Sequence, residues 1–362
     1  MKLFTIGPVE MYPSTKTIRN KGIVHFRTDE YSTIVKTTLS KLSDMLSNPV
    51  KNSLIYLAAS GTAAMEAVVE NCTTTKDKAL VINGGAFGQR FCDLLKYHNI
   101  PFDSINIKWN EALKKEHLFP YENNNYTTLF VNIHETSSGQ LYNISMLSDF
   151  CKRNNMYLIV DAISSFLADE YNIQKYGIDA TIISSQKGLC LSPGMSFVSF
   201  SNRMLEKINN NPLPSSKYFD FKDYLNNITR GQTPYTPPVC IMYELQDMLE
   251  LIEKEGGYKK RLENVEKKCK YFRTKAIKSG FKIPDYPLSN MLTPIEFDKS
   301  INAYDVIQIL KNKYRIFVNP CGGELANKLL RVSHIGNTSL EDIDDLLEKL
   351  KLSINELNGG II

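Results

Sequence analysis

The chain has 362 residues, of which 43% are hydrophobic and 23% charged, the balance of a globular protein with a sizeable core. The formal net charge of +4 is small for this length, and the basic residues alternate with glutamates, so nucleic-acid binding has little support. The seven cysteines are scattered and never spaced as C-x-x-C, which argues against a zinc site or a disulfide framework and favours a reducing compartment.

The N-terminal stretch resembles neither a signal peptide nor a membrane span. In MKLFTIGPVEMYP, glycine and proline interrupt the run before an apolar core of signal-peptide length forms, and no later apolar run approaches bilayer length. We therefore expect a cytoplasmic protein.

From about residue 53 to 200, short β-rich runs alternate with helical ones. We expect strands at 53–60, 78–84, 127–134, 156–162, 180–184 and 195–201, and helices at 61–72, 87–99 and 144–155. Continuous apolar strands separated by helices predict an α/β fold with a largely parallel sheet covered on both faces.

After about residue 240 the pattern changes to a smaller α+β domain. A long charged amphipathic segment is interrupted at Gly256-Gly257, and short strands are expected among the helices that follow it. The pattern Thr338-Ser339-Leu340-Glu341 predicts a capping box that starts the last helix. The expected strands are 291–297, 314–320 and 329–335. We expect three parts of the chain, which are an N-terminal arm at 1–20, a large domain at 21–240 and a small domain at 241–362. The proline-rich segment 233–239 is the expected hinge.

Ligands of open α/β sheets bind beyond the carboxyl ends of the strands, so the residues after each strand are the candidates for function. Ser60, Gly61 and Thr62 open a helix where the backbone N–H groups, the helix dipole and a hydroxyl favour a phosphate; an ordinary helix cap is the alternative. Phe87, within GGAFGQR, suits either a stack on a planar ligand or a place in the core.

Three further strand ends carry polar or charged residues. HETSSG at 134–139 is a denser polar cluster than a turn needs. Asp161 closes an apolar strand as a helix cap, a metal ligand or the partner of a heterocyclic nitrogen, and we favour the third because no metal partners are evident. Lys187 follows ATIIS in an otherwise uncharged stretch, where it either points into water or serves as a desolvated nucleophile.

The residues at these strand ends match what pyridoxal phosphate (PLP) requires of a binding site. Its phosphate needs an N–H nest, its ring a stacking partner, its ring nitrogen a carboxylate, and its aldehyde an amine. We therefore expect Lys187 to hold the cofactor.

The motifs SGTAAMEA, GGAFGQR, HETSSG, VDAISS, SQKGLCLSPG, TPYTPPV and RVSHIG resemble those of the class V, fold type I PLP-dependent aminotransferases. The nearest branch contains the alanine–glyoxylate, serine–pyruvate and 2-aminoethylphosphonate–pyruvate transaminases, and the resemblance runs from GPVEMYP to residue 336. It implies a mostly parallel sheet of the seven-stranded type, flanked by helices, and a homodimer with shared active sites.

The resemblance also implies a role for each motif residue. Ser60, Gly61 and Thr62 would bind the phosphate, and Phe87 would stack on the ring. Thr136 or Ser137 would approach the ring hydroxyl, Asp161 would pair with the ring nitrogen, and Gln186 would contact the cofactor beside Lys187. Tyr235 and Thr236 would reach the phosphate of the other subunit, and Arg331 would bind the substrate α-carboxylate. Two positions are less clear: Ser333 stands where the family usually has glycine, and His134 has no assigned role.

The implied reaction moves an amino group from 2-aminoethylphosphonate, alanine or serine to pyruvate or glyoxylate by a ping-pong mechanism through a Schiff base on Lys187. One alternative is a cysteine desulfurase-like PLP lyase that uses Cys321, ten residues before Arg331. It is disfavoured because Gln186 precedes the lysine, where desulfurases commonly have histidine. A PLP-fold regulator without activity is the other alternative, disfavoured because the few residues before the fold leave no room for a DNA-binding domain.

Overall fold

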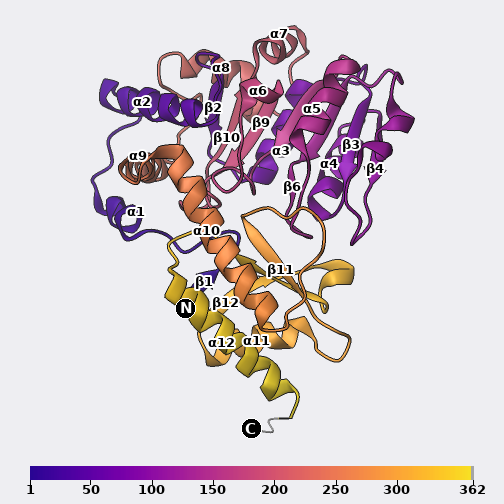
Figure 1. Cartoon of the computed structure of the whole chain (residues 1–362). Coiled ribbons are helices and arrows are strands. Elements are labelled where there is room, and N and C mark those ends of the chain that lie inside the picture. The colour runs from indigo at the N-terminus through magenta and orange to yellow at the C-terminus, as the bar shows by residue number, and fades with distance from the viewer. Residues whose placement is uncertain (360–362) are drawn as a thin grey trace.

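The computed structural model describes residues 1–359 and contains a large and a small sheet with helices around both (Figure 1). The large sheet has seven strands in the order β2-β10-β9-β8-β5-β3-β4. Its neighbouring pairs are parallel, except that β10 runs antiparallel to β2 and to β9. The strands are β2 (Leu54–Leu57), β3 (Ala79–Asn83), β4 (Phe102–Asn106), β5 (Thr128–Asn132), β8 (Tyr157–Asp161), β9 (Ala180–Ser184) and β10 (Ser196–Phe200).

The six strands predicted in this region are confirmed, because their residues are buried on both faces of the sheet and therefore read as continuous apolar runs. The edge strand β4 was not predicted. Only Ile105 of its five residues is buried, so its sequence lacks that signal. A two-stranded ribbon lies apart from the large sheet and consists of β6 (His134–Glu135) and β7 (Gln140–Leu141).

Helices surround the large sheet, and the three predicted ones are confirmed to within two residues at each end. They are α3 (Gly61–Cys72), α4 (Ala86–Tyr97) and α5 (Ile144–Arg153), accompanied by α2 (Asp29–Met45), α6 (Ile173–Tyr176), α7 (Asn202–Asn210) and α8 (Phe221–Ile228). Between residues 1 and 359, no helix combines the length and the apolar character that a membrane crossing requires.

The small sheet has four strands in the order β1-β12-β13-β11 and its own apolar core, which includes Phe4, Phe272 and Val318. The first strand pairs in parallel with β12, so the chain begins in this sheet and then crosses to the large one. The strands are β1 (Lys2–Phe4), β11 (Leu292–Glu296), β12 (Ile316–Pro320) and β13 (Leu329–Ser333).

The long helix α10 runs beside the small sheet and packs against β11 and the last helix (Figure 1). Gly256-Gly257 separates α9 from α10, as the interruption in the amphipathic segment predicts. The helices are α1 (Pro13–Thr17), α9 (Val239–Lys254), α10 (Gly257–Lys278), α11 (Ala303–Lys313) and α12 (Leu340–Leu357). The domain bounds 1–20, 21–240 and 241–362 stay a prediction.

The capping box of α12 lies one residue later than predicted. Ser339 is the N-cap: its hydroxyl accepts a hydrogen bond from the Asp342 amide (3.1 Å), and the Asp342 carboxylate accepts one from the Ser339 amide (2.9 Å). The predicted pair of Thr338 and Glu341 is therefore wrong, because the acidic residue that reaches back is the shorter Asp342.

Candidate active site

The carboxyl ends of β2, β8 and β9 meet around the start of α3. A Cβ atom at Gly61 would lie 2.6 Å from Cδ1 of Ile163, which follows β8, and 3.4 Å from Cβ of Ser184, the last residue of β9. Only glycine lets the helix begin this close to the two strand ends. Ser60, Gly61 and Thr62 are thereby brought close to the residues that follow β8 and β9.

The first turn of α3 is arranged as an anion cradle. The Ser60 hydroxyl caps the helix by accepting a hydrogen bond from the Ala63 amide (3.2 Å), and the side chain of Thr62 is exposed. The first N–H groups of a helix have no intrahelical acceptor, and the dipole makes this end electropositive. These groups are available to an anion.

Asp161 is a buried carboxylate at the end of β8. Its Oδ1 accepts a hydrogen bond from the Ile163 amide (2.8 Å), and within residues 1–359 no hydrogen-bond donor reaches Oδ2. Burial raises the pKa of Asp161 to about 6, although the charge of Lys187 works in the opposite direction. The carboxylate is therefore suited to a cationic donor such as a protonated ring nitrogen.

Lys187 lies in the turn after β9, half-buried against the N-terminal arm. A Cβ atom at Gly7 would lie 2.8 Å from Cδ of Lys187, so the arm passes directly over the lysine side chain. Burial, followed by the nearby charge of Arg331, lowers the pKa of Lys187 to about 8. Its amine loses its proton far more readily than that of an exposed lysine.

Arg331 reaches the same place from β13 of the small sheet. Its guanidinium donates hydrogen bonds to the carbonyl oxygen of Thr136 (2.7 Å) and to that of Pro320. Its Nε has no acceptor, and no carboxylate of residues 1–359 forms an ion pair with it. A cation held only by neutral carbonyl groups is ready to bind an anionic ligand.

Thr136 and Gln186 are both fixed by serines at neighbouring strand ends. The Thr136 hydroxyl is 2.5 Å from that of Ser164, and the Ser184 hydroxyl donates to Oε1 of Gln186 (2.6 Å). These bonds place Thr136 near the residues after β8 and Gln186 near the end of β9.

Phe87 lies in the first turn of α4. The side chain of Arg90, which the sequence did not single out, lies over the Phe87 ring. The guanidinium carbon of Arg90 lies 4.8 Å from the centre of the Phe87 ring, and Nη1 of Arg90 donates to the Thr62 hydroxyl (3.1 Å). The spacing of three residues in GGAFGQR, which places both side chains on one helix face, could have revealed this pair.

Tyr235 and Thr236 lie in the loop before α9. The Tyr235 hydroxyl donates to the carbonyl of Lys217 (3.0 Å), and its ring stacks on Tyr218 with 4.9 Å between ring centres. Tyr218 in turn donates to the carbonyl of Ala58 (3.3 Å), two residues before the cradle, whereas Thr236 is exposed. Within one chain, the loop is thus connected to the outer side of the cradle.

His134, Ser333 and Cys321 lie close to these residues. His134 is buried and bonded through Nδ1 to the Ser164 carbonyl, and burial lowers its pKa to about 3, so its ring is neutral. The buried Ser333 hydroxyl donates to the Met291 carbonyl (3.4 Å). The Cys321 sulfur lies 3.7 Å from the Ser137 carbonyl, and burial raises the pKa of this thiol.

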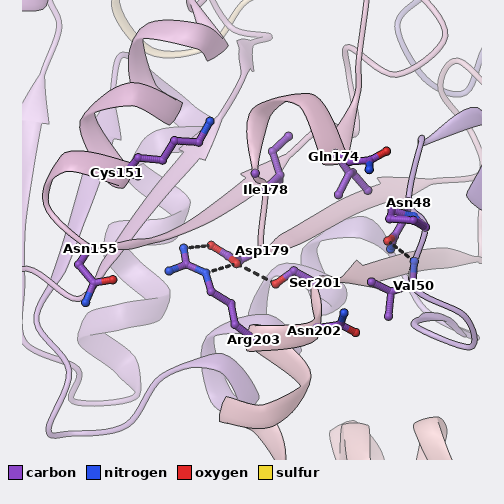
Figure 2. Close-up of a pocket in the computed structure, with 14 residues that line it drawn as sticks. Asn48, Val50, Cys151, Asn155, Gln174, Ile178, Asp179, Ser201, Asn202 and Arg203 are labelled. Carbon is purple, nitrogen blue, oxygen red and sulfur yellow. Dashed lines mark hydrogen bonds and ion pairs between the residues drawn. The ribbon is translucent and has the colours of Figure 1, made fainter.

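A cavity of about 480 Å³ lies at the opposite, amino edge of the large sheet (Figure 2). Its buried carboxylate is bonded to neighbours: Nε of Arg203 donates to Asp179 (2.6 Å), and the Ser201 hydroxyl donates to the same oxygen (2.7 Å). The other Asp179 oxygen accepts from the Leu158 amide (2.8 Å). The buried carboxylate of this cavity is therefore fully paired, and the charged group at its rim is the exposed Lys152.

The lysine, the buried carboxylate and the anion cradle at three strand ends define a PLP-dependent enzyme. The family description Aminotransferase class-V matches residues 11–346 of this chain. The chain therefore belongs to the class V aminotransferase family, and its substrates are a small amine and a 2-oxo acid. Asp161 with its free Oδ2, the open start of α3 and the unbonded amine of Lys187 fit this cofactor.

Known proteins with similar sequences or folds span nearly the whole chain. An uncharacterised aminotransferase of Methanocaldococcus jannaschii is 29% identical over 97% of this chain and 92% of its own length. A serine–glyoxylate aminotransferase of Arabidopsis thaliana is 24% identical, with 99% and 92% covered. The structure of an alanine–glyoxylate aminotransferase of Nostoc has a TM-score of 0.91 at 25% identity, with 97% and 94% covered. The predicted family, fold type and cofactor are confirmed.

Proposed function

We propose that this enzyme transfers an amino group from a small donor (2-aminoethylphosphonate, alanine or serine) to a small 2-oxo acid (pyruvate or glyoxylate). The observation that supports this most strongly is the guanidinium of Arg331, which pairs with no carboxylate of residues 1–359 and whose charge adds to burial in lowering the pKa of Lys187. A substrate with one anionic group on Arg331 and its reacting nitrogen toward Lys187 would satisfy both residues.

The residues around the strand ends would hold the cofactor in place. Bound PLP supplies an electron sink for the bond-breaking step at the substrate α-carbon. Asp161 would keep the ring nitrogen protonated, because a buried carboxylate with a raised pKa gains most from a cationic partner. The remaining contacts that we propose are Ser60, Gly61 and Thr62 to the phosphate, Phe87 to the ring face, and Thr136 and Gln186 to the ring edge.

Lys187 would hold the cofactor aldehyde covalently and then move a proton at the substrate α-carbon. A pKa of about 8 leaves part of the amine neutral near neutral pH, so it can accept a proton and return it. The N-terminal arm also covers Cδ and Cε of this side chain. The oxo product would leave before the second substrate binds, which is the order of a ping-pong mechanism.

We also propose a homodimer in which Tyr235 and Thr236 reach the phosphate of the other subunit. Thr236 is exposed, although its loop is held rigidly by Tyr235, and such a side chain is available to a second copy. Mixing the Lys187→Ala and Thr236→Val variants tests this. If the loop acts across the interface, mixed dimers contain one site with both native residues and regain activity, whereas a loop that acts within its own chain gives no recovery.

We infer a cytoplasmic location from the cysteines. All seven are free, and six of them are buried, as expected of a protein from a reducing compartment. Fractionation of cells that express the tagged chain tests this, and recovery outside the cytoplasmic fraction would contradict it.

Initial-rate kinetics test the proposed reaction. Serine and 2-aminoethylphosphonate are each paired with pyruvate and with glyoxylate, alanine is paired with glyoxylate, and both products are measured. Parallel lines in double-reciprocal plots for one pair, with stoichiometric formation of the oxo and amino products, are expected. Intersecting lines would contradict the ping-pong order, and the absence of transfer for every pair would contradict the proposed substrates.

A further inference from the structure

Arg90 occupies a position between two parts of the proposed cofactor site. It lies on α4 one turn after Phe87, and α4 packs against α3, whose first turn holds Thr62. The guanidinium lies over the Phe87 ring (4.8 Å) and donates to the Thr62 hydroxyl (3.1 Å). These two contacts fix the direction of a side chain that would otherwise be free to move in solvent.

The guanidinium of Arg90 has unused capacity for an anion. An arginine offers five N–H donors, and the Thr62 contact uses one of them. No carboxylate of residues 1–359 lies within ion-pair distance of it. Two arginines elsewhere on the surface are paired with carboxylates, Arg203 with Asp179 and Arg153 with Glu122. Arg90 is instead held beside the electropositive start of α3. Its positive charge and that helix end repel each other unless an anion binds between them.

We propose that Arg90 is a direct ligand of the cofactor phosphate, supplying the full positive charge that the neutral cradle of Ser60, Gly61 and Thr62 lacks. A phosphate ester is close to a dianion at neutral pH, and N–H groups and hydroxyls alone do not balance it. The planar fork of arginine suits two phosphate oxygens at once. The inference rests on the proposed roles of Thr62 and Phe87.

The contact with Thr62 favours the phosphate over the substrate as the anion. Thr62 is on the cradle helix, whereas the cation proposed for the substrate, Arg331, enters from the small sheet and bonds to Thr136. When Thr62 accepts a hydrogen bond from Arg90, its own hydroxyl proton is directed away from Arg90 and is free for a phosphate oxygen. Arg90 would thus both bind the phosphate and orient the Thr62 hydroxyl.

The test compares PLP with pyridoxal, which has the same ring and aldehyde without the phosphate. Dissociation constants for both are measured with the cofactor-free protein and its Arg90→Gln variant. We expect PLP to bind about 10- to 100-fold more weakly to the variant, the loss typical of hydrogen bonds to a charged group, and pyridoxal to bind equally well to both. Inorganic phosphate should compete with PLP in the native protein and less well in the variant.

Two further variants complete the experiment. Arg90→Lys keeps the charge without the fork and should fall between the native protein and Arg90→Gln. Arg153→Gln removes an exposed arginine at the far end of α5 and should change neither constant. Thermal unfolding of each cofactor-free variant shows whether the fold is intact.

Equal weakening of PLP and pyridoxal in Arg90→Gln would overturn the inference, since Arg90 would then act only through the Phe87 ring. Unchanged PLP binding would overturn it as well. Neither result would contradict the proposed function, provided that the native enzyme transfers amino groups. Conversely, a phosphate-selective loss in an enzyme without transaminase activity would support Arg90 and contradict the proposed function.

Discussion

The two edges of the seven-stranded sheet differ in how their charged groups are paired. At the carboxyl edge, Lys187 and Arg331 have no ion-pair partner among residues 1–359, and Asp161 has one free oxygen. At the amino edge, Asp179 accepts hydrogen bonds from Arg203, Ser201 and the backbone, so the charges there are balanced (Figure 2). Both edges contain buried or half-buried charge, but only one of them needs a ligand to balance it.

This difference separates a stabilising network from a reactive site. The amino edge contains a cavity of about 480 Å³, yet its buried carboxylate, Asp179, is already bonded to its neighbours. A buried charge without a partner is costly, and a fold keeps one mainly where a ligand or a reaction balances it. Unpaired charge therefore identifies the functional edge better than cavity size does.

Removal of the Lys187 amine should have the largest effect. We expect Lys187→Ala to lose roughly 10⁴-fold or more in turnover, because it removes both the covalent attachment and the proton-transferring group. Lys152→Ala, which changes an exposed lysine beside the amino-edge cavity, is the control and should keep full activity. Turnover of the alanine and glyoxylate pair measures both, and substantial activity in Lys187→Ala would refute the assignment.

A pair of arginine substitutions tests the contrast between the edges directly. Arg331→Gln should lower kcat/KM about 10²-fold, mostly through KM, because it removes the charge that holds the substrate anion. Its free energy of unfolding should be unchanged or higher, since no described carboxylate loses a partner.

Arg203→Gln should behave in the opposite way. It leaves Asp179 buried without its cation and should destabilise the protein by roughly 2 kcal/mol, a value reduced by the partial exposure of Arg203. Turnover per folded molecule should not change. The comparison would fail if Arg331→Gln lost stability instead of activity, or if Arg203→Gln lost turnover.

Asp161 should make the cofactor-free protein less stable as the pH rises from about 4 to 6, against the opposite contribution of His134, whose pKa burial lowers to about 3. Its pKa is raised from 3.8 to about 6, so between these values the folded state keeps a proton that the unfolded state has lost. This contribution is complete below about pH 4 and disappears as the pH rises toward 6. In urea unfolding at several pH values, the stability of Asp161→Asn relative to the native chain should therefore increase as the pH rises through this range.

Other buried groups give the pH dependence that remains in that variant. Asp169 also has a pKa raised to about 6 by burial, and it remains in place when Asp161 is replaced. A slope identical in Asp161→Asn and the native chain would show that Asp161 is not buried as described.

The smallest effect is expected for Cys321. Burial raises the pKa of its thiol, so the thiolate needed for sulfur chemistry is scarce. Cys321→Ser should therefore change transaminase turnover by no more than about threefold, and the native enzyme should release no sulfide from cysteine. Sulfide release that disappears in Cys321→Ser would instead establish the desulfurase alternative.

Much of the large sheet and the strand-end residues could be predicted from the sequence, because buried parallel strands read as apolar runs and their ends are chemically distinct. Lys187, Asp161 and Gly61 were found in this way. The edge strand β4 was missed because only Ile105 of its five residues is buried, so it lacks the apolar run of the inner strands.

Residues whose role depends on contacts distant in sequence were harder to predict. Arg331 was assigned only through its resemblance to a family motif, since nothing in a local pattern shows that a strand of the small sheet reaches the large one. Arg90 was missed because its contact with Thr62, 28 residues earlier, exists only once α3 and α4 pack together. Spacing along a helix predicts neighbours on that helix and not across to another.

The most direct test of the central claim is a half-reaction measured by absorbance. Purified enzyme with bound PLP is mixed with alanine, serine, 2-aminoethylphosphonate or cysteine alone, without any 2-oxo acid. We predict that at least one of the first three donors converts the visible band of the Lys187-bound cofactor to that of its amino form, and that Lys187→Ala lacks the starting band. An enzyme that binds PLP but shows no conversion with any donor, or an identical starting band in Lys187→Ala, would contradict the account.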